Sequence, residues 1–159
     1  MTDGTRAVVD FSEWERGLAN LAGPIRVQLA RSMGVAGGQV IRDVAKIYAP
    51  VKQGLLRDAI YLAYRDAYSD DTKITYSISW NAKRAPHGHL IEFGHWQTNA
   101  MYQGRDGKWY VGAPLTKPKW VAAHPFLRPA LDGSTAMARN AMMARGRERL
   151  PELLAEYAR

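Results

Sequence analysis

Residues 24–48 carry the strongest periodic pattern in the sequence. Apolar side chains recur there every three or four positions, and the charged and amide side chains lie off the apolar stripe. This spacing is typical of an amphipathic helix, which at 1.5 Å per residue would be about 40 Å long. We expect the helix to end at Ala49-Pro50, because the residue before a proline avoids the α conformation. The expected stripe consists of Leu29, Met33, Ala36, Val40, Val44 and Ile47.

Three glycines interrupt the middle of this helical pattern. Gly34, Gly37 and Gly38 each cost up to about 1 kcal/mol relative to alanine in a helix interior. Two interpretations are open at this point. The helix kinks or breaks there, or another helix or subunit approaches closely and needs the space.

After residue 58 the apolar spacing changes from helical to alternating. Large apolar or aromatic side chains occupy every second position at Ile60, Leu62 and Tyr64. After a Ser-Asp-Asp turn they do so again at Ile74, Tyr76, Ile78 and Trp80. The pattern predicts a β-hairpin over residues 59–80 with one buried face and one Thr/Ser face.

Three further helical segments are expected. A short helix is predicted over residues 10–22, with an apolar stripe from Phe11 to Leu21. A short helix or turn is predicted over 85–93, anchored by Leu90, Ile91 and Phe93. A long helix is predicted over 129–158, with Pro129 in its first turn and with Gly146 and Pro151 as points where it would weaken or kink.

Residues 94–120 combine glycine and proline with large aromatic side chains. Asp106-Gly107 is a favourable turn dipeptide, so we expect a long protruding loop or hairpin. Exposed tryptophan and tyrosine normally meet a partner. We therefore favour a protein interface over a platform for single-stranded nucleic acid, for which no recognised motif is present. The interface candidates are Trp96, Tyr102, Trp109, Tyr110 and Trp120.

The length of 159 residues fits one domain. We expect a single α+β domain over residues 1–159, in which a long N-terminal and a long C-terminal helix pack a small antiparallel sheet. Residues 1–23 are expected to be peripheral. The absence of cysteine excludes disulfides, thiolate metal sites and thiol nucleophiles. No apolar run is long enough to span a bilayer and no signal peptide is evident, so we expect a soluble protein made in the cytoplasm.

The formal net charge of +7 is distributed in alternating blocks. Residues 26–57 carry +5, residues 58–72 carry −3, and residues 73–119 carry +5. Dedicated nucleic-acid readers concentrate their charge on one face. Blocks of alternating sign fit complementary subunit surfaces at least as well.

Histidines gather around one glutamate. His87, His89 and His95 lie near Glu92, and these residue types are those of a zinc site, but their spacing matches no usual metal motif. The alternative is that Glu92 caps or pairs locally. Of its charged partners we favour a buried ion pair with Arg128 over a catalytic role. No catalytic or phosphate-binding motif is present, so we expect no metal, no cofactor and no enzymatic activity.

Three segments in this order resemble one protein family. They are VAKIYAPVKQGLLR at 44–57, HLIEFG at 89–94 and HPFLRPAL at 124–131. Together they resemble the tail-completion or head–tail joining proteins of long-tailed bacteriophages, also known as minor tail components, over about residues 25–150. The matching motif residues are Pro50, Gly54, Glu92, Phe93, Gly94, Pro125, Phe126, Arg128 and Pro129. His95 departs from the family, where threonine is frequent, and residues 94–120 are longer and richer in tryptophan than the family pattern.

The resemblance implies a structural virion protein of the phage neck. Such proteins form rings, usually of six subunits, between the connector and the tail tube. They dock on other neck proteins, the tail terminator and the tail tube, and they leave a passage for double-stranded DNA. The implied location is the virion, with the host cytoplasm during assembly and with no membrane contact.

Two other functions stay open. One is a tail terminator or another neck component. The other is a nucleic-acid-binding protein or a metal-dependent nuclease, suggested by the net charge and the histidines. The candidates for contact with DNA are Lys83, Arg84, Lys117 and Lys119.

Overall fold

The structure is a computed structural model, and it describes residues 23–52 and 54–158. The α+β class expected from the sequence is confirmed. The predicted helix at 10–22 lies outside the described residues. The elements in chain order are helix α2 (Gly23–Tyr48), helix α3 (Leu55–Ala59), strand β1 (Ile60–Tyr64), 3-10 helix η1 (Asp66–Tyr68), strand β2 (Tyr76–Trp80), helix α4 (Gly88–Phe93), strand β3 (His95–Gln103), strand β4 (Trp109–Val121) and helix α5 (Leu127–Tyr157).

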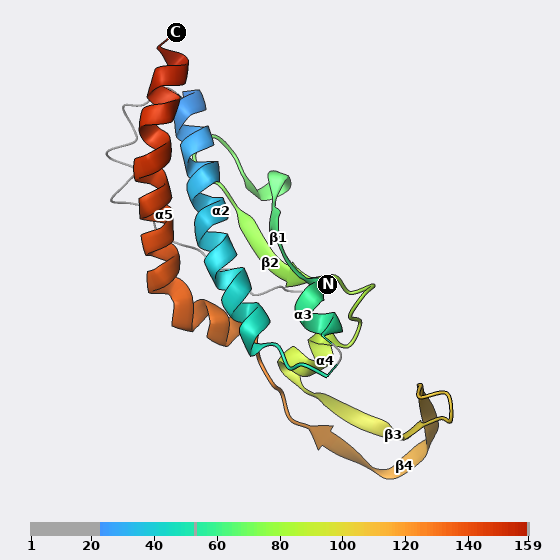
Figure 1. The fold of residues 1–159 in the computed structure, drawn as a ribbon. Helices are drawn as coiled ribbons and strands as arrows, with labels where there is room; N and C mark the ends of the chain where they lie inside the picture. Colours follow the sequence, from blue (N-terminus) through green and yellow to red (C-terminus); the bar gives the residue numbers. More distant parts are fainter. Residues whose placement is uncertain (1–22, 53, 159) are drawn as a thin grey trace.

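The two long helices, α2 and α5, lie side by side and antiparallel (Figure 1). The buried residues of α2 recur every four positions: Ile25, Leu29, Met33, Gly37, Ile41 and Ala45. The stripe expected from the sequence is therefore partly wrong, and its member Ile47 is 75% exposed. A row with a spacing of four drifts slowly around the helix. Such a row can follow a second helix that crosses at an angle.

The glycines of α2 lie where other elements approach it closely. A Cβ atom added at Gly37 would lie 2.5 Å from Cγ of Met142 and 3.3 Å from the carbonyl oxygen of Ala138, both on α5. Added atoms at Gly34 and Gly38 would meet the Tyr76 ring and the Leu62 side chain of the sheet. Because α2 runs through all three positions unbroken, close approach is the correct interpretation and a break is not.

The β-hairpin predicted over residues 59–80 is confirmed. Strands β1 and β2 pair antiparallel, with Ile60 opposite Trp80 and Tyr64 opposite Tyr76. The Tyr64 end of the sheet is attached to α2 through Arg31, whose guanidinium lies 4.7 Å from the Tyr64 ring centroid. The Arg31 carbonyl accepts a hydrogen bond from the Tyr76 hydroxyl at 3.2 Å. The sheet therefore runs along α2, with its Ile60 end toward the C-terminus of that helix.

The buried apolar side chains form two clusters, one toward each end of α2. The cluster at the C-terminal end joins α2, α3, β1 and the start of α5 around Phe126, which is fully buried. The cluster at the N-terminal end joins α2 to the second half of α5 and contains Ile25, Leu29, Met33, Met142 and Leu153. The first cluster contains Phe126, close to the point where strands β3 and β4 leave the body.

Helix α5 begins at Leu127, two residues before the predicted start, and continues through Gly146 and Pro151. It bends in its N-terminal part, drawn in orange in Figure 1. In that part the hydroxyl groups of Ser134 and Thr135 donate to the carbonyl oxygens of Ala130 and Leu131. Hydroxyl groups that bond to a carbonyl four residues earlier bend helices.

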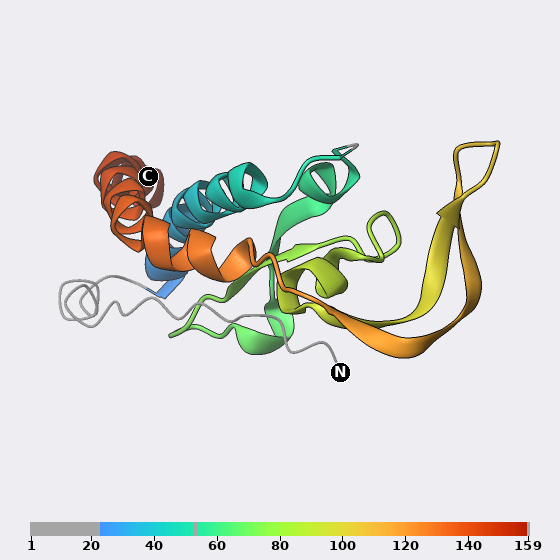
Figure 2. The same ribbon diagram turned by 90° about the horizontal axis from the view of Figure 1, so that it is seen from below.

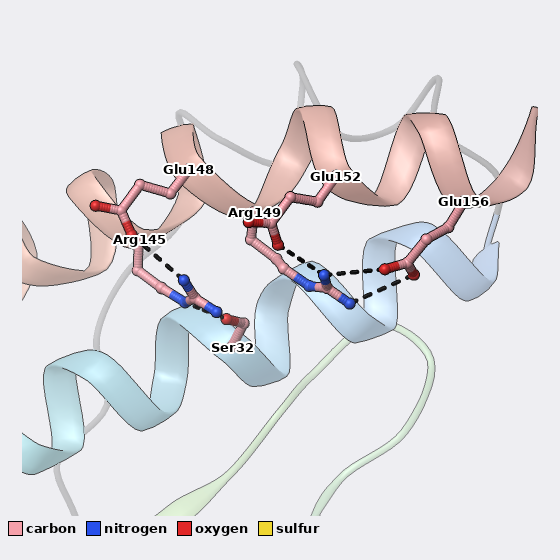
Figure 3. A network of polar contacts seen from close by, with 6 residues as sticks. All are labelled: Ser32, Arg145, Glu148, Arg149, Glu152 and Glu156. Atoms are coloured by element: carbon pink, nitrogen blue, oxygen red, sulfur yellow. Dashed lines mark hydrogen bonds and ion pairs between the residues drawn. The ribbon is translucent and has the colours of Figure 1, made fainter.

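Arginines on α5 form a polar network along the junction with α2 (Figure 3). Arg145 donates to the Ser32 hydroxyl of α2 at 2.9 Å and pairs with Glu148 at 3.3 Å. Arg149 pairs with Glu152 at 2.7 Å and with Glu156 at 3.1 Å. Exposed pairs of this kind add at most about 1 kcal/mol each. The ion pairs all lie within α5, and the hydrogen bond from Arg145 to Ser32 is the contact of this network that joins the two helices.

Candidate functional site

The glutamate among the histidines caps the last helix. Glu92 lies in α4 and is only 4% exposed. Its carboxylate accepts hydrogen bonds from the backbone N–H groups of Phe126 at 2.8 Å, Leu127 at 3.1 Å and Arg128 at 3.3 Å. The first N–H groups of a helix lack partners within the helix and carry a partial positive charge. One carboxylate from a distant element satisfies three of them.

The predicted ion pair between Glu92 and Arg128 is wrong. Arg128 contacts Glu92 through its backbone N–H, and the residue as a whole is exposed. The reason is that α5 begins without a capping side chain of its own, so its N–H groups need an acceptor from elsewhere. That missing cap is a sequence signal, since HPFLRP offers no Ser, Thr, Asp or Asn at the start of the helix.

The histidines do not assemble a metal centre with Glu92. Among the described residues, no group of three or more histidine, aspartate or glutamate side chains lies close enough to hold a metal ion. His87, His89 and His124 are exposed and His95 is half-buried. The Glu92 carboxylate is already engaged by the backbone of α5.

The segments that carry the motif meet at the base of a projecting hairpin. The His124 N–H donates to the Ile91 carbonyl at 2.7 Å, and the rings of Trp80 and Phe126 pack edge to face at 5.9 Å. Gly94 has φ 73°, and an added Cβ atom there would lie 2.8 Å from the Val121 carbonyl oxygen. A left-handed backbone with no side chain is therefore required where α4 turns into β3.

The other motif residues have separate structural positions. Gly54 is buried with φ 76° just before α3, and Pro50 is half-buried just after α2. Pro125 and Pro129 are exposed on either side of the α5 start. Phe93, predicted to anchor α4, is 53% exposed, so that prediction is wrong. The preceding residue, Glu92, is buried instead, because its carboxylate points toward the start of α5.

The hairpin predicted at 94–120 is formed by β3 and β4, and it projects from the body and curves (Figure 2). We call residues 95–121 the hairpin arm. Its register shifts where β3 advances two residues from Gln97 to Asn99 while β4 covers five between Pro114 and Lys119. Extra residues on one strand bend a hairpin. Pro114 and Pro118, which lack an N–H group to donate, lie on the irregular stretch.

Aromatic pairs follow the hairpin arm. The rings of Trp96 and Trp120 are 5.3 Å apart edge to face, and those of Tyr102 and Tyr110 are stacked at 5.8 Å. All four side chains are exposed, Trp96 at 62%. The ring of Trp109, also exposed, is contacted by the Lys52 ammonium at 4.8 Å. The sequence places these aromatics on one segment, but it gives no sign of the contact with Lys52.

Both faces of the hairpin arm carry apolar side chains. Met101 pairs with Val111, and the next pair is Tyr102 with Tyr110. Because successive side chains point to opposite faces of a strand, these two pairs lie on opposite sides. A solvated hairpin normally keeps one face polar. On this arm both faces are apolar and exposed.

The four candidates for contact with DNA lie on two different segments. Lys83 and Arg84 are in the turn after β2, and Lys117 and Lys119 are on β4. All four are exposed. None of them forms an ion pair with a carboxylate in the part of the chain that the structure describes.

The turn of the hairpin arm is held by a carboxylate whose pKa is lowered. The Tyr110 hydroxyl donates to Asp106 at 2.7 Å and the Lys108 N–H donates at 3.1 Å, and both lower the pKa of the Asp106 carboxyl. The same bond raises the pKa of the Tyr110 hydroxyl. A lowered pKa means that this contribution is present above the unfolded carboxyl pKa and is lost as the pH falls through the folded one.

We therefore predict that an NMR titration places the Asp106 midpoint below the ordinary value of about 3.9. Replacement of the donor in Tyr110→Phe raises that midpoint toward the ordinary value, while the arm keeps its turn at neutral pH. An unchanged midpoint in Tyr110→Phe would show that the hydroxyl does not hold this turn.

The fold and the site define a small α+β domain whose uncovered aromatic side chains gather on a projecting hairpin, as expected of a subunit in a protein assembly. A family model described as "Bacteriophage HK97-gp10, putative tail-component" matches residues 12–94, which is 83 of the 159 residues. The chain belongs to this HK97-gp10-like family. The match ends at Gly94, where the hairpin arm begins.

The other comparisons add no relative. No curated protein and no solved structure matches the chain. Across the described residues, no helix combines the length and apolar character that crossing a membrane requires.

Proposed function

We propose that this chain is a structural subunit of the phage neck that completes the tail or joins it to the head. Its family gives the coarser assignment of a tail component. The observation that supports the finer one is the hairpin arm, whose two faces both expose apolar side chains to solvent. Such an arm is suited to reach into a neighbouring subunit and become covered there.

In this proposal the chain works by binding and not by catalysis. Copies form a ring of six that contacts other neck proteins, the tail terminator and the tail tube in the virion, after assembly in the host cytoplasm. The exposed bases Lys83, Arg84, Lys117 and Lys119 are available for non-specific contact with DNA in the central passage. A tail terminator is the alternative within the same machine, and the position of the ring in a reconstruction of the particle distinguishes the two.

Loss of this chain is expected to leave separate heads and tails. The test is a phage whose gene for this chain is interrupted, complemented from a plasmid and examined by electron microscopy and by infectious titre. Unmodified protein restores joined particles. Joined, infectious particles in the absence of any complementing protein would contradict the proposal.

Complementation with an altered arm tests which surface is responsible. Trp96→Ser combined with Tyr102→Ser removes one ring from each aromatic pair, and both side chains are more than half exposed. We expect a titre at least 100-fold lower, with the free energy of unfolding changed by less than about 1 kcal/mol because little buried area is lost. Met137→Ser, at a similarly exposed site on α5, is the matched control and should complement fully.

A further inference from the structure

The hairpin arm and one turn of the body carry opposite charges. The arm contains Arg105, Lys108, Lys117 and Lys119 against one acid, Asp106, and has a net charge of +3. We call residues 66–73, which lie within the connection between β1 and β2 and follow Arg65, the acidic turn. It contains Asp66, Asp70 and Asp71 against Lys73, for a net charge of −2, and all four are exposed.

These two charged regions lie at opposite ends of the body. The acidic turn follows the Tyr64 end of the sheet, which is attached to α2 through Arg31 in the N-terminal half of that helix. The arm leaves the body beside Phe126, at the other end of the same sheet, and curves (Figures 1 and 2). Its far end meets the body at the loop after α2, where the Lys52 ammonium lies 4.8 Å from the Trp109 ring. The arm of one copy therefore does not lie on its own acidic turn.

The sheet next to the acidic turn has an outer face of mostly small side chains. Leu62 and Ile78 point inward, toward α2 and the core. The alternation of strand residues then places Tyr61, Ala63, Ser77 and Ser79 on the outer face. The Arg65 guanidinium lies beside them, at the edge next to the acidic turn, and donates to the Ser77 hydroxyl at 2.9 Å. Tyr61 is 39% exposed. Ala63, Ser77 and Ser79 are half-buried, and their short side chains leave space for large aromatic side chains beside Tyr61.

We propose that the hairpin arm of one copy lies across the outer face of the β1–β2 sheet of a second copy, with its bases against the acidic turn. The inference deepens the proposed function, because it names the surfaces through which the ring closes. Contact between two different surfaces repeats from copy to copy and closes into a ring when the rotation allows it. At about 3.3 Å per residue, nine residues of β3 extend about 30 Å, roughly the width of a small domain.

The apolar content of the arm favours a second copy over DNA as its occupant. With Lys117 and Lys119 placed against carboxylates of that copy, Lys83 and Arg84 are the candidates that stay available for contact with DNA. Contacts to a DNA backbone need bases and polar groups, and they leave aromatic pairs on both faces uncovered. A protein surface with a small-residue face and adjacent carboxylates covers the rings and neutralises the bases together.

Charge reversal on each surface tests the pairing. The arm variant is Lys117→Glu with Lys119→Glu, and the turn variant is Asp66→Lys with Asp71→Lys. Asp70 is left unchanged because its carboxylate accepts from the Thr72 and Lys73 N–H groups and shapes the turn. Self-association of the purified full-length chain is measured by sedimentation at low salt over a range of concentrations. The same variants are measured in particles by carbodiimide coupling of amines to carboxylates between copies.

Each single-surface variant is expected to weaken self-association at least tenfold and to abolish the coupling between copies. The chain that carries all four reversals is expected to recover both within about threefold, since attraction is restored with the signs exchanged. Circular dichroism checks that every variant is folded.

Three results would overturn the inference. The first is a turn variant whose self-association is unchanged. The second is a chain with all four reversals whose self-association does not recover. The third is unmodified protein that shows neither association in solution nor coupling between copies in particles. Failure of the proposed function is separate, because it is read from joined particles. Joined particles that depend on the chain while the reversals have no effect would leave the function standing and remove this contact.

Discussion

Glu92→Ala is expected to lower the free energy of unfolding by about 3 kcal/mol, which for a chain of this size lowers the melting temperature by about 10 °C. The substitution removes the acceptor for three N–H groups at the start of α5 and leaves them without a partner in a buried place. The same contact holds α4 against α5 at the base of the hairpin arm. Denaturant unfolding followed by circular dichroism measures the loss.

Arg128→Ala is the control that separates capping from the ion pair suggested by the sequence. Because the cap uses the backbone N–H of Arg128 and the residue is exposed, we expect a change within about 0.5 kcal/mol. Equal losses in the two variants would restore the ion pair. Glu92→Gln is expected to be intermediate, since it keeps one acceptor oxygen and turns an amide donor toward the other N–H groups.

Gly37→Leu is expected to destabilise the chain by about 3 kcal/mol through overpacking. Its Cβ atom alone would lie 2.5 Å from Met142 Cγ and 3.3 Å from the Ala138 carbonyl oxygen, which belongs to a backbone that cannot rotate away. The two long helices must separate, and both buried clusters lie along their contact. The measurement is the midpoint and slope of denaturant unfolding.

Two companion variants identify the cause of that loss. Gly133→Ala, in α5, adds a Cβ atom 3.6 Å from the Tyr48 hydroxyl, an ordinary contact. We expect it to stabilise the chain by up to about 1 kcal/mol through helix propensity. Combining Gly37→Leu with Met142→Ala frees the space, so the double variant should be more stable than the sum of the single losses by at least about 1 kcal/mol. Strict additivity would contradict close packing at Gly37.

Within the described residues, the hairpin arm has no second layer of structure over it. This is why the arm is the element that connects the structure to the proposed neck function. The body has two buried clusters, whereas β3 and β4 form a two-stranded sheet on which none of the described helices packs. A two-stranded hairpin is marginally stable on its own. Coverage by a neighbouring subunit would both stabilise the arm and make assembly the step in which its aromatic side chains leave water.

The sequence by itself determined the two long helices and the β1–β2 hairpin, but it did not predict the short helix α3 and left residues 94–120 as a loop or hairpin. The periods of 3.6 and 2 are local properties of the backbone, so residues 24–48 and 59–80 could be assigned without any partner. The turn at Asp106-Gly107 and the end of α2 before Pro50 are local for the same reason. The family motif was also readable, since it depends on residue types in order.

Only the tertiary structure decided what those elements face. The buried row of α2 follows the crossing of α5, so Ile47 is exposed although its spacing fits the predicted stripe. Glu92 binds backbone N–H groups that lie 34 to 36 residues away. The sequence shows that the start of α5 lacks a capping side chain of its own, but it does not show which distant side chain supplies the acceptor. The two apolar faces of the arm depend on the register between its strands. Each of these is a contact between distant segments, which forms only when the whole chain packs.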